Sequence, residues 1–245
     1  MAEPGDIAVA RRMIAMIDLT DLADDRSPAG IDDLCARAAL NGTAAVCVWP
    51  DHVARCAAQL AGTRIRIATV VNFPSGDEPI DAVVAKTAHA LDDGAHEIDV
   101  VMPYRSLLAH RTEDVVALLD ATRDATGDRL LKVILETGEL PDLDTVRAAT
   151  RLAIDHGADF VKTSTGKTAV SATVPAVRAM LDVVHEATDV RPVGIKPSGG
   201  IRSFDDARGY LAIADDVMGP AWATASTFRF GASGLLDALL TVIDG

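Results

Sequence analysis

The chain has 245 residues, of which 49% are hydrophobic and 24% are charged, enough for the core of one large domain or two small ones. Its net charge of −13 makes it a poor binder of polyanions, so neither nucleic acid nor an anionic membrane surface is an expected partner. The sequence has no apolar run of the ~18 residues that a membrane-spanning helix needs, and its acidic start, MAEPGD, lacks the apolar segment of a secretory signal.

Helical patterns alternate with short apolar runs along the whole chain. The pattern of residues 27–42 has a Ser-Pro start and an Asn-Gly end, and that of residues 112–127 begins with Thr112 as its expected N-cap. Residues 141–157 follow the same pattern, and Ser203 is expected to start another helix. We predict strands at Ala15–Leu19, Ala44–Val48, Ile67–Val71, Glu97–Val101, Leu131–Leu135, Phe160–Lys162, Val193–Lys196 and Ser226–Phe230.

A weak internal sequence repeat indicates that the chain is built from one repeated structural unit. The segments NGTAAVCV, DGAHEIDVV and HGADFVKTS each join a helix-ending glycine to a strand through a short link. Eight strands alternating with helices, at roughly 30 residues per unit, predict a single (β/α)8 barrel domain over residues 1–245. A doubly wound open sheet is the alternative.

Alternation along the predicted strands places charges inside this barrel. In EIDVV, Ile98 and Val100 face the helices, so Asp99 faces the interior. Burying an unpaired charge costs several kcal/mol, so an interior charge needs a reason. One reason is an ion-pair network that merely closes the barrel, and the other is an active site, which in such barrels lies at the C-terminal strand ends. The same alternation, which we call parity, places further side chains in the interior: Asp18, Thr20, Cys47, Lys132, Ile134, Glu136, Lys162 and Lys196.

The lysines indicate which chemistry the interior supports. Only five of the 23 basic residues are lysines, and lysine, unlike arginine, can lose its proton and act as a nucleophilic amine. A normal lysine pKa is near ~10.4, and a neighbouring ammonium together with desolvation lowers it. Two interior lysines with Asp99 as proton carrier therefore predict Schiff-base catalysis. Parity treats Lys162 and Lys196 alike, so it does not say which one attacks.

No metal or cofactor is expected, because an iminium is itself the electron sink. The six histidines form no metal-binding pair. The three cysteines, Cys35, Cys47 and Cys56, show no metal spacing and are interpreted as free thiols in a reducing compartment.

Two glycine-rich loops indicate a phosphate site. KPSGGIRSFDDA leads into the helix expected at Ser203, and RFGASGLLDALL joins a strand to the last helix. Exposed N–H groups in such loops and at helix N-termini bind phosphate. Tight turns also need glycine, but together with Lys167 the two loops favour a phosphorylated ligand.

The motifs DLTDL, VCVWP, VVNFPSG, EIDVVMPY, LKVILETGEL, ADFVKTSTGK, GIKPSGGIR and RFGAS, in this order over residues 18–233, resemble deoxyribose-phosphate aldolases. The resemblance implies a class I aldolase that reversibly cleaves 2-deoxy-D-ribose 5-phosphate to D-glyceraldehyde 3-phosphate and acetaldehyde. It also implies a cytoplasmic homodimer that acts in deoxyribonucleoside breakdown. Another Schiff-base sugar-phosphate aldolase and a non-catalytic sugar-phosphate-binding barrel remain alternatives.

The resemblance also implies residue roles. Lys162 would form the Schiff base, Lys196 would lower its pKa, and Asp99 would donate and accept the proton. The substrate pocket would be lined by Asp18, Thr20, Cys47, Lys132 and Thr165. The phosphate would be held by Gly166, Lys167, Gly199, Gly200, Arg202, Gly231 and Ser233. One departure concerns Gly234, which stands where some members have a second serine.

Overall fold

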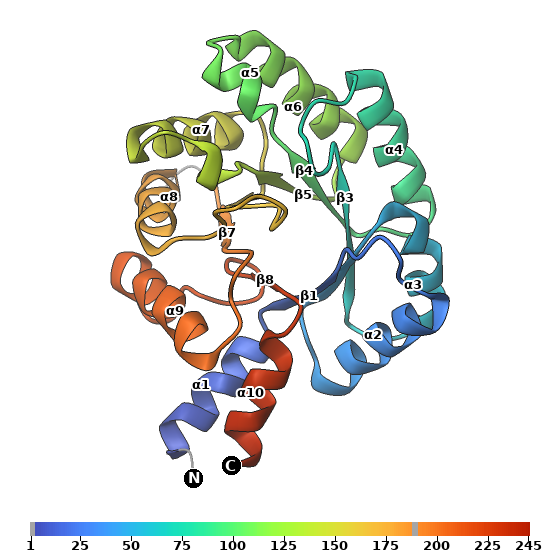
Figure 1. The fold of residues 1–245 in the computed structure, drawn as a ribbon, viewed down its shortest axis with the longest axis vertical. Coiled ribbons are helices and arrows are strands. Elements are labelled where there is room, and N and C mark those ends of the chain that lie inside the picture. Colours follow the sequence, from blue (N-terminus) through green and yellow to red (C-terminus); the bar gives the residue numbers. More distant parts are fainter. Residues whose placement is uncertain (1–2, 188–190) are drawn as a thin grey trace.

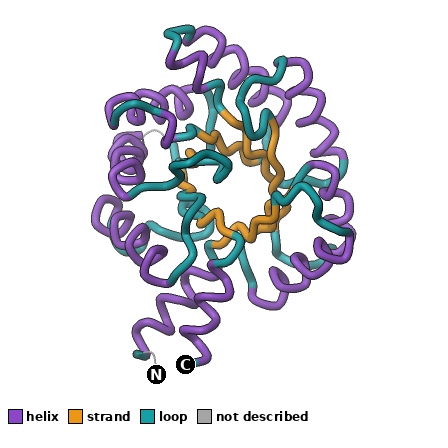
Figure 2. The backbone as a smooth tube through the Cα atoms, viewed as in Figure 1, coloured by secondary structure: helices purple, strands orange, loops and turns teal. Residues whose placement is uncertain are grey.

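The computed structural model of the chain describes residues 3–187 and 191–245 and has the predicted (β/α)8 architecture. Residues 1–2 and 188–190 of the predicted domain lie outside the described residues. One parallel eight-stranded sheet has the order β7-β6-β5-β4-β3-β2-β1-β8 (Figure 1). Single bridges, Ile195 to Phe228 and Ser198 to Gly231, bring its two outer strands together. The open doubly wound alternative is therefore wrong, and Figure 2 shows the strands as a ring with helices outside it.

Six of the predicted strands lie within one residue of their expected bounds, and the first and the last are shifted. Ala15 caps a helix, so the first strand begins at Ile17. Ser226 lies in a turn that is closed by the bond from Phe228 N to Thr224 O (2.7 Å), so the last strand begins at Phe230. The strands are β1 (Ile17–Asp21), β2 (Ala45–Val48), β3 (Arg66–Val71), β4 (Glu97–Val101), β5 (Leu130–Ile134), β6 (Phe160–Lys162), β7 (Gly194–Lys196) and β8 (Phe230–Ala232).

The helices surround the ring. An N-terminal helix that the sequence analysis did not predict lies beside the C-terminal one below the ring in Figure 1. None of the described helices is long and apolar enough to cross a membrane. The helices are α1 (Pro4–Ile14), α2 (Pro28–Asn41), α3 (Val53–Gln59), α4 (Ile80–Asp92), α5 (Tyr104–Leu108), α6 (Thr112–Thr126), α7 (Leu143–Asp155), α8 (Val174–Ala187), α9 (Phe204–Met218) and α10 (Leu235–Asp244), with 3-10 turns at Pro50–His52 and Thr137–Glu139.

The helix ends follow the sequence signals with one exception. Ser27 accepts a hydrogen bond from Gly30 N at the start of α2, which Gly42 ends in a left-handed conformation (φ 69°). Ser203 forms a capping box with Asp206 at the start of α9. The expected cap at Thr112 is wrong: this residue is the first of α6, and no side chain caps that helix.

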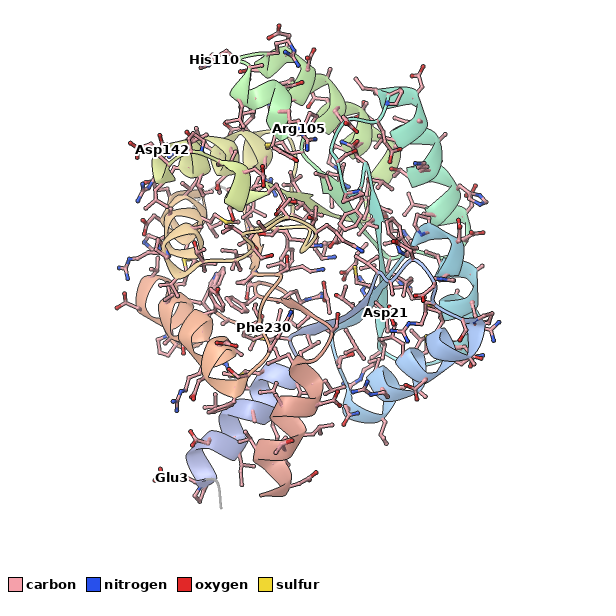
Figure 3. The ribbon with its side chains drawn as sticks, viewed as in Figure 1. Glu3, Asp21, Arg105, His110, Asp142 and Phe230 are labelled. Carbon is pink, nitrogen blue, oxygen red and sulfur yellow. The ribbon has the colours of Figure 1, made fainter. Side chains whose placement is uncertain are left out.

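An apolar layer lies between the strands and the helices. Val46, Val48, Ile98 and Val100, all predicted to face outward, are completely buried there. The three cysteines are free and buried. The opposite faces of the strands line the ring, and Figure 3 shows side chains filling it, whereas Glu3, His110 and Asp142 lie at the outer edge of the molecule. The charged residues that parity placed inside are therefore surrounded by a closed wall of strands.

Candidate active site

Charged side chains from six places around the ring meet inside it. They come from β1, β4, β5, β6 and β7 and from the residue just before β8, and each is at most 5% exposed. Strand register brings them together, because it pairs Asp99 with Lys132 and Lys162 with Lys196 on neighbouring strands. We name this set the buried charge cluster: Asp18, Glu97, Asp99, Lys132, Lys162, Lys196 and Arg229.

Asp99 is the centre of the cluster. Its Oδ1 atom accepts a hydrogen bond from Lys132 Nζ at 2.7 Å. Its Oδ2 atom accepts from Lys162 Nζ at 2.9 Å and from Lys196 Nζ at 2.8 Å. Of the three residues predicted to carry the reaction, Lys162 and Lys196 thus both donate to the same oxygen of the third, Asp99.

The rest of the cluster lies behind Asp99. Asp18 pairs with Lys196 Nζ (2.6 Å) and with Arg229 Nη1 (2.6 Å). Glu97 pairs with Lys132 Nζ (2.6 Å) and with Arg229 Nη2 (3.1 Å).

Sequence reasoning missed Glu97 and Arg229, although both had a signal. Glu97 is two residues before Asp99 and shares its parity, and Arg229 stands between Phe228 and Phe230, both of which are buried.

The two lysines that parity could not distinguish differ in their surroundings. Among the described residues, Lys162 is paired with Asp99 alone, whereas Lys196 is paired with both Asp99 and Asp18. Burial lowers the pKa of Lys162, and the ammonium of Lys196 lowers it further, against the opposing effect of Asp99. Burial alone would also lower the pKa of Lys196, but Asp18 and Asp99 outweigh it and raise that pKa. Lys162 is therefore the amine that loses its proton more readily.

Both central carboxylates stay ionised. Burial alone would raise the pKa of Asp99, but Lys132, Lys162 and Lys196 hold it well below its usual range. Asp18 is likewise lowered despite its burial, chiefly by Lys196 and Arg229.

A cavity of about 480 Å³ opens above Lys162 at the C-terminal ends of the strands. Gly166, Gly199 and Gly200 line it in left-handed conformations (φ 79°, 83° and 78°). A side chain at Gly199 would also collide with Ser171 Oγ, 2.4 Å from an ideal Cβ atom. We name it the glycine cavity, and its wall includes Thr20, Thr165, Gly166, Lys167, Gly199, Gly200, Arg202, Gly231, Ser233 and Gly234.

The cavity brings together every residue expected to hold a phosphate. Lys167 Nζ donates to the carbonyl oxygen of Leu22 at 2.9 Å, across the cavity from its own loop. Of the residues expected to contact the rest of the substrate, Thr20 and Thr165 line the wall. Asp18, Cys47 and Lys132 do not: they are fully buried and do not reach its surface.

Glu136 supports the loop between the two lysines of KTSTGK. It is completely buried, in a left-handed conformation (φ 52°), just after β5. Its carboxylate accepts hydrogen bonds from Thr165 N (3.3 Å), Thr165 Oγ1 (2.5 Å) and Thr168 Oγ1 (3.3 Å). Burial raises the pKa of Glu136, against these hydrogen bonds. Parity predicted that Glu136 points inward but gave no sign of this partner loop.

Comparisons with known proteins agree with this site. A model of the DeoC/LacD family of aldolases matches residues 12–238. A deoxyribose-phosphate aldolase of Agrobacterium fabrum is 49% identical over 236 residues, which are 95% of this chain and 90% of that protein.

Solved structures of deoxyribose-phosphate aldolases are also similar to this chain. A candidate deoxyribose-phosphate aldolase from Coccidioides immitis has a TM-score of 0.84 and 32% identity, over 98% of this chain and 87% of that one. Another from Toxoplasma gondii ME49 has a TM-score of 0.89 and 27% identity, over 99% of both chains. The tetrameric deoxyribose phosphate aldolase of Aeropyrum pernix, at 23% identity and a TM-score of 0.77 over 98% of this chain and 97% of that one, shares the fold.

Proposed function

The chain belongs to the DeoC/LacD family of aldolases, and we propose that it is a class I deoxyribose-phosphate aldolase whose Schiff base forms on Lys162. It cleaves 2-deoxy-D-ribose 5-phosphate reversibly to D-glyceraldehyde 3-phosphate and acetaldehyde, in the breakdown of deoxyribonucleosides. One observation carries the assignment of the nucleophile. Among the described residues, Lys162 is the one lysine that belongs to the buried charge cluster and also lines the glycine cavity.

The reaction begins with attack of the neutral Lys162 amine on the C1 aldehyde of the open-chain sugar. The carbinolamine loses water and becomes an iminium, which draws electrons from the bond between C2 and C3. Removal of the C3 hydroxyl proton breaks that bond, so glyceraldehyde 3-phosphate leaves and an enamine stays on the lysine. Protonation at C2 and addition of water then release acetaldehyde and restore the amine.

Asp99 and Lys196 supply the charges that these steps need. Asp99 Oδ2 is 2.9 Å from Lys162 Nζ, within reach of the atoms that gain and lose protons, directly or through one water molecule. Lys196 remains an ammonium, because Asp18 and Asp99 raise its pKa, and it disfavours a second positive charge on Lys162. Lys132, held by Glu97 and Asp99, orients the other oxygen of Asp99.

The glycine cavity binds the phosphate. A chain with a net charge of −13 must attract a phosphate locally, and the cavity offers Lys167, Arg202 and loops rich in backbone N–H groups. The loop after β6 joins this cavity to Lys162, so the reactive end and the phosphate end of the substrate are held by one segment. Thr20 and Thr165 lie between them and contact the sugar hydroxyls, whereas Asp18 and Cys47 shape the floor from below.

We further propose a homodimer in the cytoplasm, as the resemblance implies. The deoxyribose phosphate aldolase of Aeropyrum pernix, which shares the fold, is a tetramer, so a tetramer is the alternative to the dimer. Light scattering during size-exclusion chromatography distinguishes a dimer from a tetramer. A mass four times that of the chain would contradict the proposed dimer.

Trapping the Schiff base tests the function. The protein is incubated with acetaldehyde and borohydride, with and without excess 2-deoxy-D-ribose 5-phosphate, and its peptides are mapped by mass spectrometry. We expect a two-carbon adduct on Lys162 that the sugar phosphate suppresses, whereas any modification of the exposed Lys86 should not respond to the sugar. An unmodified Lys162 would refute the assignment. Consumption of the sugar phosphate is then compared between 2-deoxy-D-ribose 5-phosphate and ketose phosphates, and faster cleavage of a ketose phosphate would indicate a different sugar-phosphate aldolase.

A further inference from the structure

The buried charge cluster does not balance its charges. In the part of the chain that the structure describes, it joins four cations, Lys132, Lys162, Lys196 and Arg229, to three carboxylates, Asp18, Glu97 and Asp99. Fully ionised, the cluster carries one positive charge that is shielded from water. Losing a single proton from one lysine brings its net charge to zero. A buried net charge is unfavourable, so the composition of the cluster itself favours one neutral amine.

Arg229 creates this excess. Its guanidinium pairs with Asp18 and Glu97, the same two carboxylates that pair with Lys196 and Lys132. Arginine does not lose its proton in a protein, and the two carboxylates raise the pKa of Arg229 further against the effect of burial. Without Arg229, those carboxylates would be fully available to Lys132 and Lys196. Asp99 would then stabilise the ammonium of Lys162 more strongly.

Three other titratable groups near the cluster are common to the wild-type protein and to every variant described below. Cys47 on β2 is fully buried, and burial raises the pKa of its thiol, which keeps it neutral. Glu136, after β5, is a buried carboxyl group outside the cluster that is engaged with Thr165 and Thr168, and the charge of Lys162 acts on its pKa. Arg66 on β3 comes within 3.9 Å of Glu97, but its side chain is half exposed, so water screens its charge. All three remain the same in the variants proposed below.

We propose that Arg229 and Glu97 are positioning residues of the reaction: by setting the net charge of the buried cluster, they determine how readily Lys162 gives up its proton. This inference rests on the proposed function, because it takes Lys162 to be the reacting amine. Neither residue lines the glycine cavity. Their effect on the chemistry therefore passes through Lys132, Lys196 and Asp99.

The two residues act in opposite directions. Arg229→Met removes a cation, so that the ammonium form of Lys162 no longer makes the cluster positive, and the lysine holds its proton to higher pH. Glu97→Gln removes a carboxylate, leaves the cluster with two excess cations and makes Lys162 lose its proton at lower pH. The double variant Glu97→Gln/Arg229→Met restores the original excess of one. Arg229→Lys keeps the charge but loses the shape and the hydrogen bond to Ala225 O.

The test measures the neutral amine directly. The wild-type protein and the four variants are treated with acetaldehyde and cyanoborohydride from about pH 5 to about pH 9, the range across which perturbed lysines titrate. The rate at which Lys162 is alkylated is followed by mass spectrometry, and kcat/KM for 2-deoxy-D-ribose 5-phosphate is measured in parallel. Circular dichroism and thermal unfolding establish that each variant is folded.

We expect Arg229→Met to react about threefold to tenfold more slowly than the wild-type protein at the acidic end and equally fast at the alkaline end. Glu97→Gln should react faster at the acidic end, and the double variant and Arg229→Lys should follow the wild-type profile. Equal losses at all pH values in Arg229→Met and Arg229→Lys, or shifts of the same sign in Arg229→Met and Glu97→Gln, would overturn the proposal. If Arg229→Met does not fold, the pH profiles of Glu97→Gln and of the double variant still test the proposal. A wild-type protein that is not alkylated at Lys162 refutes the proposed function instead.

Discussion

The buried charge cluster and the glycine cavity meet at Lys162 but are built in different ways. The cluster consists of long side chains that strand register holds against one another, with no more than 5% of any of them exposed. The cavity consists mainly of backbone, in loops where Gly166, Gly199 and Gly200 take conformations that other residues avoid.

The difference separates chemistry from recognition. Under the proposed function, a substitution in the cluster should change which amine is neutral and therefore the rate of bond cleavage. A substitution in the cavity wall should change how strongly the phosphate is held and should leave the reaction of an unphosphorylated sugar nearly unchanged.

Lys162→Arg should have the largest effect. The guanidinium stays positively charged beside Asp99 and cannot become a neutral nucleophile. We expect kcat for cleavage to fall by about four orders of magnitude or more and the borohydride-trapped adduct to disappear. Lys86→Arg is the matched control and should keep full activity, because Lys86 pairs with Glu78 on the surface, away from the cluster. Substantial activity in Lys162→Arg, with an adduct on another lysine, would show that the cluster uses a different amine.

Lys167→Met should come next and should affect only the phosphorylated substrate. A hydrogen bond to a charged group contributes about 1.5–3 kcal/mol, so kcat/KM for 2-deoxy-D-ribose 5-phosphate should fall roughly tenfold to a hundredfold. Unphosphorylated 2-deoxy-D-ribose, assayed in parallel, should react at the wild-type rate. Inorganic phosphate should also lose its ability to inhibit. An equal fall in kcat/KM for both sugars would contradict the separate roles of the cavity in phosphate binding and of the cluster in bond cleavage.

The two regions also differ in how far the sequence predicts them. Asp99, Lys132, Lys162 and Lys196 follow from alternation alone, because the apolar residue just before each of them fixes the face of the strand. Glu97 and Arg229 obey the same rule, and extending it to both ends of each strand would have included them. Alternation could not separate Lys162 from Lys196, since the difference lies in contacts with Asp18 from β1, far away in the sequence.

Loop geometry is less accessible from sequence. That Gly166 and Gly199 line one wall depends on how loops after different strands converge, and the sequence analysis assigned them through a family resemblance. Glu136 shows the same limit, because nothing near it in the chain indicates that its carboxylate holds Thr165 and Thr168.

Glu136→Gln sharpens the comparison, because this residue is not part of the cavity wall but supports the loop that joins the two regions. Glutamine replaces one of the two acceptor oxygens by an NH2 donor, so hydrogen bonds donated by Thr165 or Thr168 to that oxygen are lost or must reverse, and an unmet buried donor costs about 1–3 kcal/mol. We expect KM for the phosphorylated sugar to rise by about tenfold, with a smaller change in kcat. Thr168→Val, which removes one of these hydrogen bonds, should cause a smaller rise. An unchanged KM with a large fall in kcat would show that Glu136 affects the chemical step, as the cluster does, and not the binding of the substrate.

Gly234→Ser should have the smallest effect and is expected to improve binding. Gly234 lines the cavity at the start of α10, with a backbone conformation (φ −100°, ψ −5°) that any residue adopts. No atom lies within 4 Å of an ideal Cβ there, so a serine fits without displacing the wall. One additional hydroxyl donor, worth about 0.5–1.5 kcal/mol, should lower KM for 2-deoxy-D-ribose 5-phosphate about threefold. Gly234→Ala adds the carbon without the hydroxyl and should leave KM unchanged. If alanine improves binding as much as serine, the gain comes from a stiffer backbone, and the wall does not hold the phosphate through its donors at this position.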